Sequence, residues 1–226
     1  MRTRARQKEI VFITHGGKRR GAGRKPRGEK AGVVHASRPF LSGREPVLVT
    51  LKVGKHVSNL RTRRAFAQIV PAFFAARERS GLRLVQFSVQ HDHLHLIVEA
   101  DDRTALSRGV QGLSVRIARA LNRMMDRTGK VFADRFHDRV LSTPRQIRAA
   151  LAYVLCNARK HGKAPRERGW RDPYSSAPAF DGWRGTSPDA LTPMPVIVAP
   201  RTWLLAVGWR RGGLLDPDHC PGVMPS

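Results

Sequence analysis

A short stretch near the middle of the chain holds residues that could bind a metal ion. Residues 90–98 read Gln-His-Asp-His-Leu-His-Leu-Ile-Val. In a β-strand successive side chains point to opposite faces, so His93 and His95 would share one face and Leu94 would lie on the other. Two neutral imidazoles side by side on a rigid strand can hold one divalent cation. Such a pair also occurs on protein surfaces without any ligand, so the pattern needs further chemical partners.

A later segment supplies two such partners. Tyr153 and Asn157 are four residues apart, which places them on the same face of a helix. The Asn157 amide oxygen could contact a metal, and the Tyr153 phenol could act as a nucleophile. Lys160, on the same flank, could contact a phosphate. Without the histidine strand, Tyr153 is more typical of a half-buried packing residue, and Asn157 is more typical of a polar residue near a helix end.

A sheet with flanking helices must position these residues. Apolar periodicity, β-branched runs and the positions of Gly and Pro define the expected elements. Strands are predicted at 47–53, 83–90, 93–99 and about 136–142, and helices at 61–79, about 104–126 and 144–162. The two central strands predict a hairpin, and Pro71 interrupts the first helix. The order β-α-β-β-α-β-α predicts an α+β fold, a ferredoxin-like antiparallel sheet with helices on one face.

The composition divides the chain into three parts. Residues 1–44 are rich in Lys, Arg and Gly and are predicted to be a flexible basic arm. Residues 45–162 contain the predicted sheet and helices and form the expected catalytic domain. Residues 163–226 are rich in Pro, Gly and Trp and form a C-terminal extension, whose tryptophans are expected to pack rather than to stack on bases.

The net charge indicates an anionic partner. The 226 residues include 42 Lys and Arg against 17 Asp and Glu, a formal charge of +25. Nucleic acid is the natural polyanion for such a protein. No apolar run approaches the ~20 residues that span a membrane, and residues 10–13 are too short for a signal peptide. Two cysteines form neither a disulfide framework nor a metal knuckle. We therefore expect a soluble, cytoplasmic protein without a membrane partner.

Two groups of basic residues are candidates for contacts to nucleic acid. One group lies on the outer side of the predicted helix at 104–126: Arg108, Arg116, Arg119 and Arg123. The other lies in the arm, where Arg24, Lys25 and Arg27 surround a proline and could follow a minor groove. Either group is also typical of a solvated basic surface, so these assignments depend on the nucleic-acid partner.

The motifs together resemble the single-tyrosine members of the HUH endonuclease superfamily, and in particular the bacterial REP-associated tyrosine transposases. The histidine–hydrophobe–histidine motif is His93-Leu94-His95, and the tyrosine helix is Tyr153-Val154-Leu155-Cys156-Asn157. Residues 129–138 resemble the connector before the fourth strand, and residues 172–177 resemble the segment after the helix. The likeness covers roughly residues 45–185. It departs from the family where Ala158, rather than Pro, follows Asn157, and where Gln-His-Asp precedes the motif.

This resemblance implies a mechanism. His93, His95 and Asn157 would hold Mg²⁺ or Mn²⁺, and Tyr153 would attack the scissile phosphate. The products would be a 5′-phosphotyrosine and a free 3′-OH, which could later be rejoined to a new end. The implied substrate is single-stranded DNA beside a hairpin. The implied protein is a monomer or homodimer of the bacterial cytoplasm, associated with the nucleoid.

Two alternatives remain open from the sequence. A ferredoxin-like domain could bind hairpin DNA or RNA without cutting it, although the predicted strands are poor in the aromatic residues on which RNA bases stack. A zinc hydrolase could use His91, His93 and His95, but no HExxH motif or distant Cys/His set completes that site.

Overall fold

The computed structural model describes residues 40–219, all within one compact unit. Most of the predicted arm, including Arg24, Lys25 and Arg27, lies outside the described residues, as do residues 220–226. Among the described residues, no helix has the length and apolar character needed to cross a membrane.

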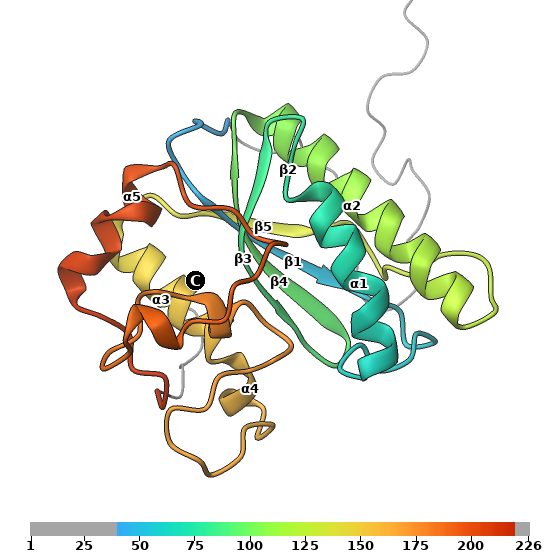
Figure 1. Cartoon of the computed structure of the whole chain (residues 1–226). Helices are drawn as coiled ribbons and strands as arrows, with labels where there is room; N and C mark the ends of the chain where they lie inside the picture. Colours follow the sequence, from blue (N-terminus) through green and yellow to red (C-terminus); the bar gives the residue numbers. More distant parts are fainter. Residues whose placement is uncertain (1–39, 220–226) are drawn as a thin grey trace, which may run out of the picture. The chain divides into compact units, whose positions relative to one another are not determined.

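The core of the unit is a five-stranded sheet in the order β2-β3-β4-β1-β5, with every neighbouring pair antiparallel. The strands are β1 Val47–Lys52, β2 Glu78–Arg79, β3 Leu82–Val89, β4 His93–Ala100 and β5 His137–Val140 (Figure 1). The predicted ferredoxin-like order is confirmed. It gains the two-residue strand β2, which pairs with the start of β3.

Three long helices connect or follow the strands, and each begins at a side-chain cap. They are α1 Arg63–Ala76, α2 Arg103–Met124 and α3 Pro144–Leu155, followed by the short helices α4 Asn157–Lys160 and α5 Trp203–Ala206. The side chains of Thr62, Asp102 and Thr143 accept hydrogen bonds from backbone N–H groups in the first turns of α1, α2 and α3. These bonds satisfy donors that have no partner within the helix, which fixes where each helix begins.

Helices α1 and α2 cover one face of the sheet, as predicted (Figure 1). Their apolar stripes bury Phe73 and Ile117 against sheet residues such as Val49 and Leu96, all completely excluded from solvent. This first core holds the leucines that alternate with the histidines on β4.

The prediction of helices on one face is wrong for α3, which lies on the opposite face (Figure 1). Leu48, Val85 and Ile97 point away from α1 and α2 and pack in a second core with α3 residues such as Ile147 and Leu151. The inner strands are therefore apolar on both faces. Covering both faces removes this surface from water, which is the reason for the second layer.

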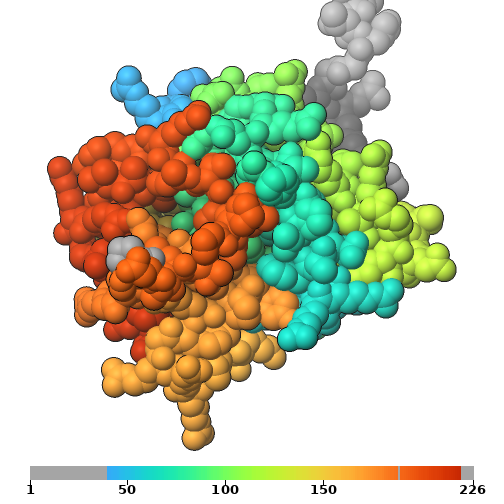
Figure 2. Space-filling view, in the orientation of Figure 1, coloured from blue at the N-terminus to red at the C-terminus, as the bar shows by residue number. Residues whose placement is uncertain are grey.

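The C-terminal residues complete this second layer. Val89 N–H donates to the Tyr174 carbonyl at 2.9 Å and Ser176 N–H donates to the Phe87 carbonyl at 3.0 Å, so this segment pairs with β3 beyond the end of β2. Trp183 and Trp209 are buried in the second core, in agreement with the packing expected of them, whereas Trp203 is half exposed. Figure 2 shows these orange and red residues covering this side of the sheet, next to the teal residues of α1.

Candidate active site

The histidine pair lies on the sheet face that carries α3. In the strand register, His95 lies opposite Thr50 of β1 and Ser88 of β3, while His93 lies opposite Lys52. The two imidazole centroids are 4.6 Å apart. His95 is buried, His93 is half-buried, and His91 is exposed just before the strand begins. The predicted alternation along β4 is therefore present.

Each of the two rings is held at its Nδ1 atom. The Thr50 hydroxyl lies 3.0 Å from His95 Nδ1, and an Asp92 carboxylate oxygen lies 2.7 Å from His93 Nδ1. Lys52 Nζ lies 3.7 Å from the other Asp92 oxygen. Hydrogen bonds to one ring nitrogen orient an imidazole so that its other nitrogen is available to a ligand.

Tyr153, in the last turn of α3, faces the histidines from the second layer. Its phenolic oxygen lies 3.3 Å from His95 Nε2, and the two ring centroids are 4.9 Å apart. The Lys160 ammonium lies 5.0 Å from the centroid of the Tyr153 ring. The structure thus brings together His93, His95, Tyr153 and Lys160, all of which the sequence analysis selected.

Asn157 lies close to Tyr153, although not on a continuous helix. The structure ends α3 at Leu155 and begins α4 at Asn157, with Cys156 between them. The Asn157 side chain is completely buried, and neither its oxygen nor its nitrogen has a hydrogen-bond partner among the described residues. Burying an unpaired amide costs free energy. A cation would satisfy the oxygen, so the residues present fit the metal that the family resemblance implies.

Burial controls the protonation of these groups. It lowers the pKa of His95 from 6.5 to about 3, with smaller contributions from the positive charges of His93, His161 and Lys160. His95 is therefore neutral at pH 7 and can offer a lone pair. Burial also raises the pKa of the Tyr153 phenol, which the nearby Asn157 amide offsets in part. The phenol therefore carries its proton at neutral pH.

Further basic residues surround the histidines and were not selected from the sequence. A hollow of about 160 Å³ beside His93 is lined by residues that include Arg61, His161 and Lys163. Arg61 is not free there, because its guanidinium forms a paired salt bridge with the buried Asp172. His161 lies one position beyond the Asn157–Lys160 helix. Its spacing from Tyr153 does not by itself indicate that the two residues belong to one site.

The arginines predicted to grip DNA lie elsewhere. Arg108, Arg119 and Arg123 are exposed on α2, whereas Arg116 is half-buried and donates to the Gly112 carbonyl. Because α2 and α3 cover opposite faces of the sheet, the structure does not bring these arginines to Tyr153. Arg119 and Arg123 instead line an open hollow of about 510 Å³ at the end of α2.

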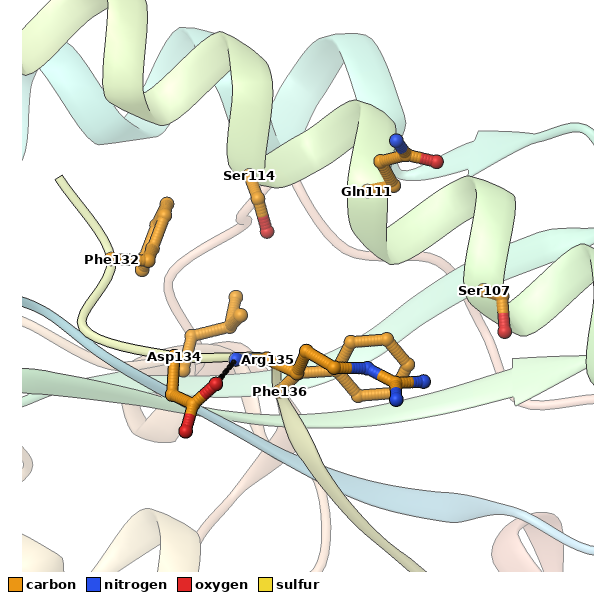
Figure 3. A pocket seen from close by; sticks show the side chains of 8 residues that line it. Ser107, Gln111, Ser114, Phe132, Asp134, Arg135 and Phe136 are labelled. Atoms are coloured by element: carbon orange, nitrogen blue, oxygen red, sulfur yellow. Dashed lines mark hydrogen bonds between the residues drawn. The ribbon is translucent and has the colours of Figure 1, made fainter. Parts of the chain in front are cut away.

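A further hollow of about 340 Å³ lies between α2 and the connector before β5. Figure 3 shows Ser107, Gln111 and Ser114 on α2, across from the connector that carries Phe132 and Phe136. From the sequence, this connector stands out only through the family resemblance, because its residues are distant from α2 along the chain.

The zinc site considered as an alternative is not formed. Within residues 40–219, no group of three or more His, Cys, Asp or Glu side chains is arranged to hold a metal. His91 is exposed and lies before β4, so it does not join the other two histidines as a third ligand. A metal site here requires a ligand of another type, such as the Asn157 amide.

Comparison with known proteins shows which solved structures and which family model this chain resembles. The chain resembles a solved REP-associated tyrosine transposase bound to a REP hairpin, at 17% identity and a TM-score of 0.52, over 63% of this chain and 82% of that one. A candidate transposase from Deinococcus radiodurans R1 matches at 16% identity and a TM-score of 0.37, over 50% of this chain and 86% of that one. No curated protein matches.

Residues 52–154 match the model of the family described as "Transposase IS200 like". The matched residues include both histidines and Tyr153, while Asn157 and the C-terminal segment lie beyond them.

Proposed function

We propose that this protein cleaves and rejoins single-stranded DNA beside hairpins through a covalent bond to Tyr153. The observation that carries the proposal is the 3.3 Å approach of the Tyr153 phenol to Nε2 of His95, next to His93 and the unpaired Asn157 amide. Tyr153 would supply the nucleophile, and the two imidazoles with the buried Asn157 oxygen would supply the metal ligands. The match of residues 52–154 to a transposase family supports DNA as the substrate.

The reaction exchanges one phosphate ester for another. The phenolic oxygen of Tyr153 bonds to phosphorus while the bond from phosphorus to the 3′-oxygen breaks. The phenol loses its proton and the leaving 3′-oxygen gains one. The result is a 5′-phosphotyrosine and a free 3′-OH, and attack by a 3′-OH reverses the step. No nucleotide cofactor is needed, because the ester bond is retained.

A divalent cation, Mg²⁺ or Mn²⁺, would be held by His93, His95 and Asn157. When bound, such an ion withdraws charge from the phosphate oxygens. Nε2 of His95 cannot accept a hydrogen bond from Tyr153 and bind a cation at the same time. With a cation held there, the Tyr153 phenol would no longer donate to this nitrogen, and its oxygen would be available to the phosphate. Lys160, above the same ring, would bind a phosphate oxygen.

The DNA hairpin would lie against α2, on the other side of the sheet. Arg108, Arg119 and Arg123 are exposed there, and the solved neighbour of the same fold is bound to a REP hairpin. Arg116 and the arm residues Arg24, Lys25 and Arg27 would add contacts in the same electrostatic way. In this proposal residues 45–162 carry the chemistry, residues 1–44 hold DNA, and the protein acts as a monomer or homodimer.

The test is a covalent adduct with a hairpin-flanked DNA strand in the presence of Mn²⁺. A label at the 3′ end should move with the protein in a denaturing gel, whereas a label at the 5′ end should appear on a released fragment with a free 3′-OH. EDTA and the double variant His93→Ala, His95→Ala should both abolish the adduct.

The chain provides a matched control, because it contains two tyrosines. Tyr153→Phe should abolish the adduct, while Tyr174→Phe should keep it, since Tyr174 packs against Phe66 and the first core. An adduct that persists in Tyr153→Phe would refute the nucleophile. Tight hairpin binding by the wild type without any adduct would favour a non-catalytic binding protein instead.

A further inference from the structure

Thr50 contacts the buried histidine of the site from a neighbouring strand. It lies on β1 directly opposite His95, with its hydroxyl 3.0 Å from Nδ1 of that ring. Strand β1 is hydrogen-bonded to β4 on one side and to β5 on the other, so the sheet itself fixes where this hydroxyl lies. Sequence motifs did not select Thr50, because only the strand register brings it to His95.

The contact matters because a neutral imidazole has two forms. One ring nitrogen carries the proton and donates, and the other carries a lone pair and accepts. The two nitrogens of His95 have different partners, the Thr50 hydroxyl at Nδ1 and the Tyr153 phenol at Nε2. A cation at this site needs the lone pair on Nε2, the nitrogen that faces Tyr153. The proton must therefore be on Nδ1.

We propose that Thr50 is a positioning residue that accepts the Nδ1–H of His95 and so keeps the Nε2 lone pair directed into the site. The effect of Thr50 on cation binding rests on the proposed function, whereas its effect on the tautomer of His95 does not. Asp92 holds Nδ1 of His93 in the same manner. Both histidines are then prepared for a ligand before any ligand arrives.

The tautomer of His95 tests this directly in the metal-free protein. Nitrogen-15 NMR of the imidazoles should place the proton of wild-type His95 on Nδ1. Thr50→Val keeps the branched shape that strands favour but removes the acceptor. In this variant the Nε2–H form should become populated, and the Mn²⁺ affinity should fall about tenfold to hundredfold. Thr50→Ser, which retains the hydroxyl, should restore both.

Ser88 offers a matched control on the other neighbouring strand. It also lies opposite His95, but its oxygen accepts from the Gln90 amide at 2.6 Å rather than contacting the ring. Ser88→Ala should therefore leave the tautomer and the Mn²⁺ affinity unchanged.

Two outcomes would overturn the assignment: a wild-type His95 that carries its proton on Nε2, or a Thr50→Val protein with the wild-type tautomer. If the wild type bound no Mn²⁺, the proposed metal role would fail. The NMR comparison would still decide the role of Thr50, so the two failures are distinguishable.

Discussion

Asn157 illustrates, at the scale of one residue, how a functional site can lower the stability of a fold. Its amide is completely buried with both polar atoms unpaired. Leucine has a similar size and carries no polar group. We expect Asn157→Leu to raise the free energy of unfolding in EDTA by about 1–3 kcal/mol, because the unpaired amide is removed. Urea denaturation measures this change.

The melting temperature of the same variant should no longer rise when metal is added. A cation that binds only the folded state raises the apparent stability. Mn²⁺ should therefore raise the melting temperature of the wild type but not that of Asn157→Leu. A variant that is less stable than the wild type in EDTA would contradict the view of Asn157 as an unsatisfied ligand.

His95 should make the stability depend on pH. Its pKa is about 3 in the folded protein and 6.5 as a free group. Below pH 6.5 the unfolded chain binds a proton that the folded His95 does not, so stability is present above this pH and falls as the pH falls. Between pH 7.5 and 5 this loss is about 2 kcal/mol. Denaturation of the wild type and His95→Gln in EDTA should show a shallower pH dependence in the variant.

At the scale of elements, two glycines in α2 should respond to substitution in opposite directions. A Cβ at Gly109 would lie 2.5 Å from the Leu82 Cβ of β3, whereas a Cβ at Gly112 would meet only the end of the Arg116 side chain, at 3.1 Å. Gly109→Ala should therefore cost about 1–3 kcal/mol through overpacking. Gly112→Ala should gain up to about 1 kcal/mol from helix propensity. Equal effects in urea denaturation would argue against the close packing of α2 on β3.

Most helices and strands could be predicted because the sequence patterns that define them span only a few neighbouring residues. The alternation of histidine and leucine on β4 and the proline at the start of α3 each act within a few residues. The side of the sheet on which α3 packs could not be predicted from such local patterns. It depends on Leu48, Val85 and Ile97, whose outward direction follows from strand register and from the irregular pairing of β3 near Val85.

The site was predictable where its residues are close in sequence and unpredictable where pairing assembles it. His93 with His95 and Tyr153 with Asn157 could be selected by spacing. Thr50 joins them only through the pairing of β1 with β4. The interruption at Cys156 was also missed, since no Gly or Pro marks it, although it separates the helix of Tyr153 from the helix of Asn157.

At the scale of the whole molecule, the C-terminal residues belong to the same folded unit as the sheet. Asp172 forms a buried, paired salt bridge with Arg61, just before α1. Glu99 of β4 accepts hydrogen bonds from the backbone N–H groups of Arg201 and Thr202, at the start of α5. Breaking such a buried pair leaves an uncompensated charge. The Asp172 pair therefore ties the segment to the start of α1, and Glu99 ties it to the strand that carries the histidines.

The positive charge should act as a distributed binding surface, with α2 as its part nearest the hairpin. Each phosphate contact releases counter-ions, so the logarithm of affinity falls with the logarithm of salt by about 0.9 per contact on duplex DNA. Replacing Arg108, Arg119 and Arg123 by Ala should reduce this slope by up to about 2.7. Fluorescence anisotropy with a labelled hairpin, without metal and in a Tyr153→Phe background, measures the slope.

The control removes the same charge from other surfaces. Arg63, Arg79 and Arg145 are also exposed but lie outside α2, so their replacement by Ala changes the net charge equally, from +25 to 25 − 3 = +22. If net charge alone attracts DNA, both triple variants should weaken binding to the same degree. If α2 holds the hairpin, the α2 variant should lose more of the slope, because its arginines contact phosphates rather than contribute only to the long-range field.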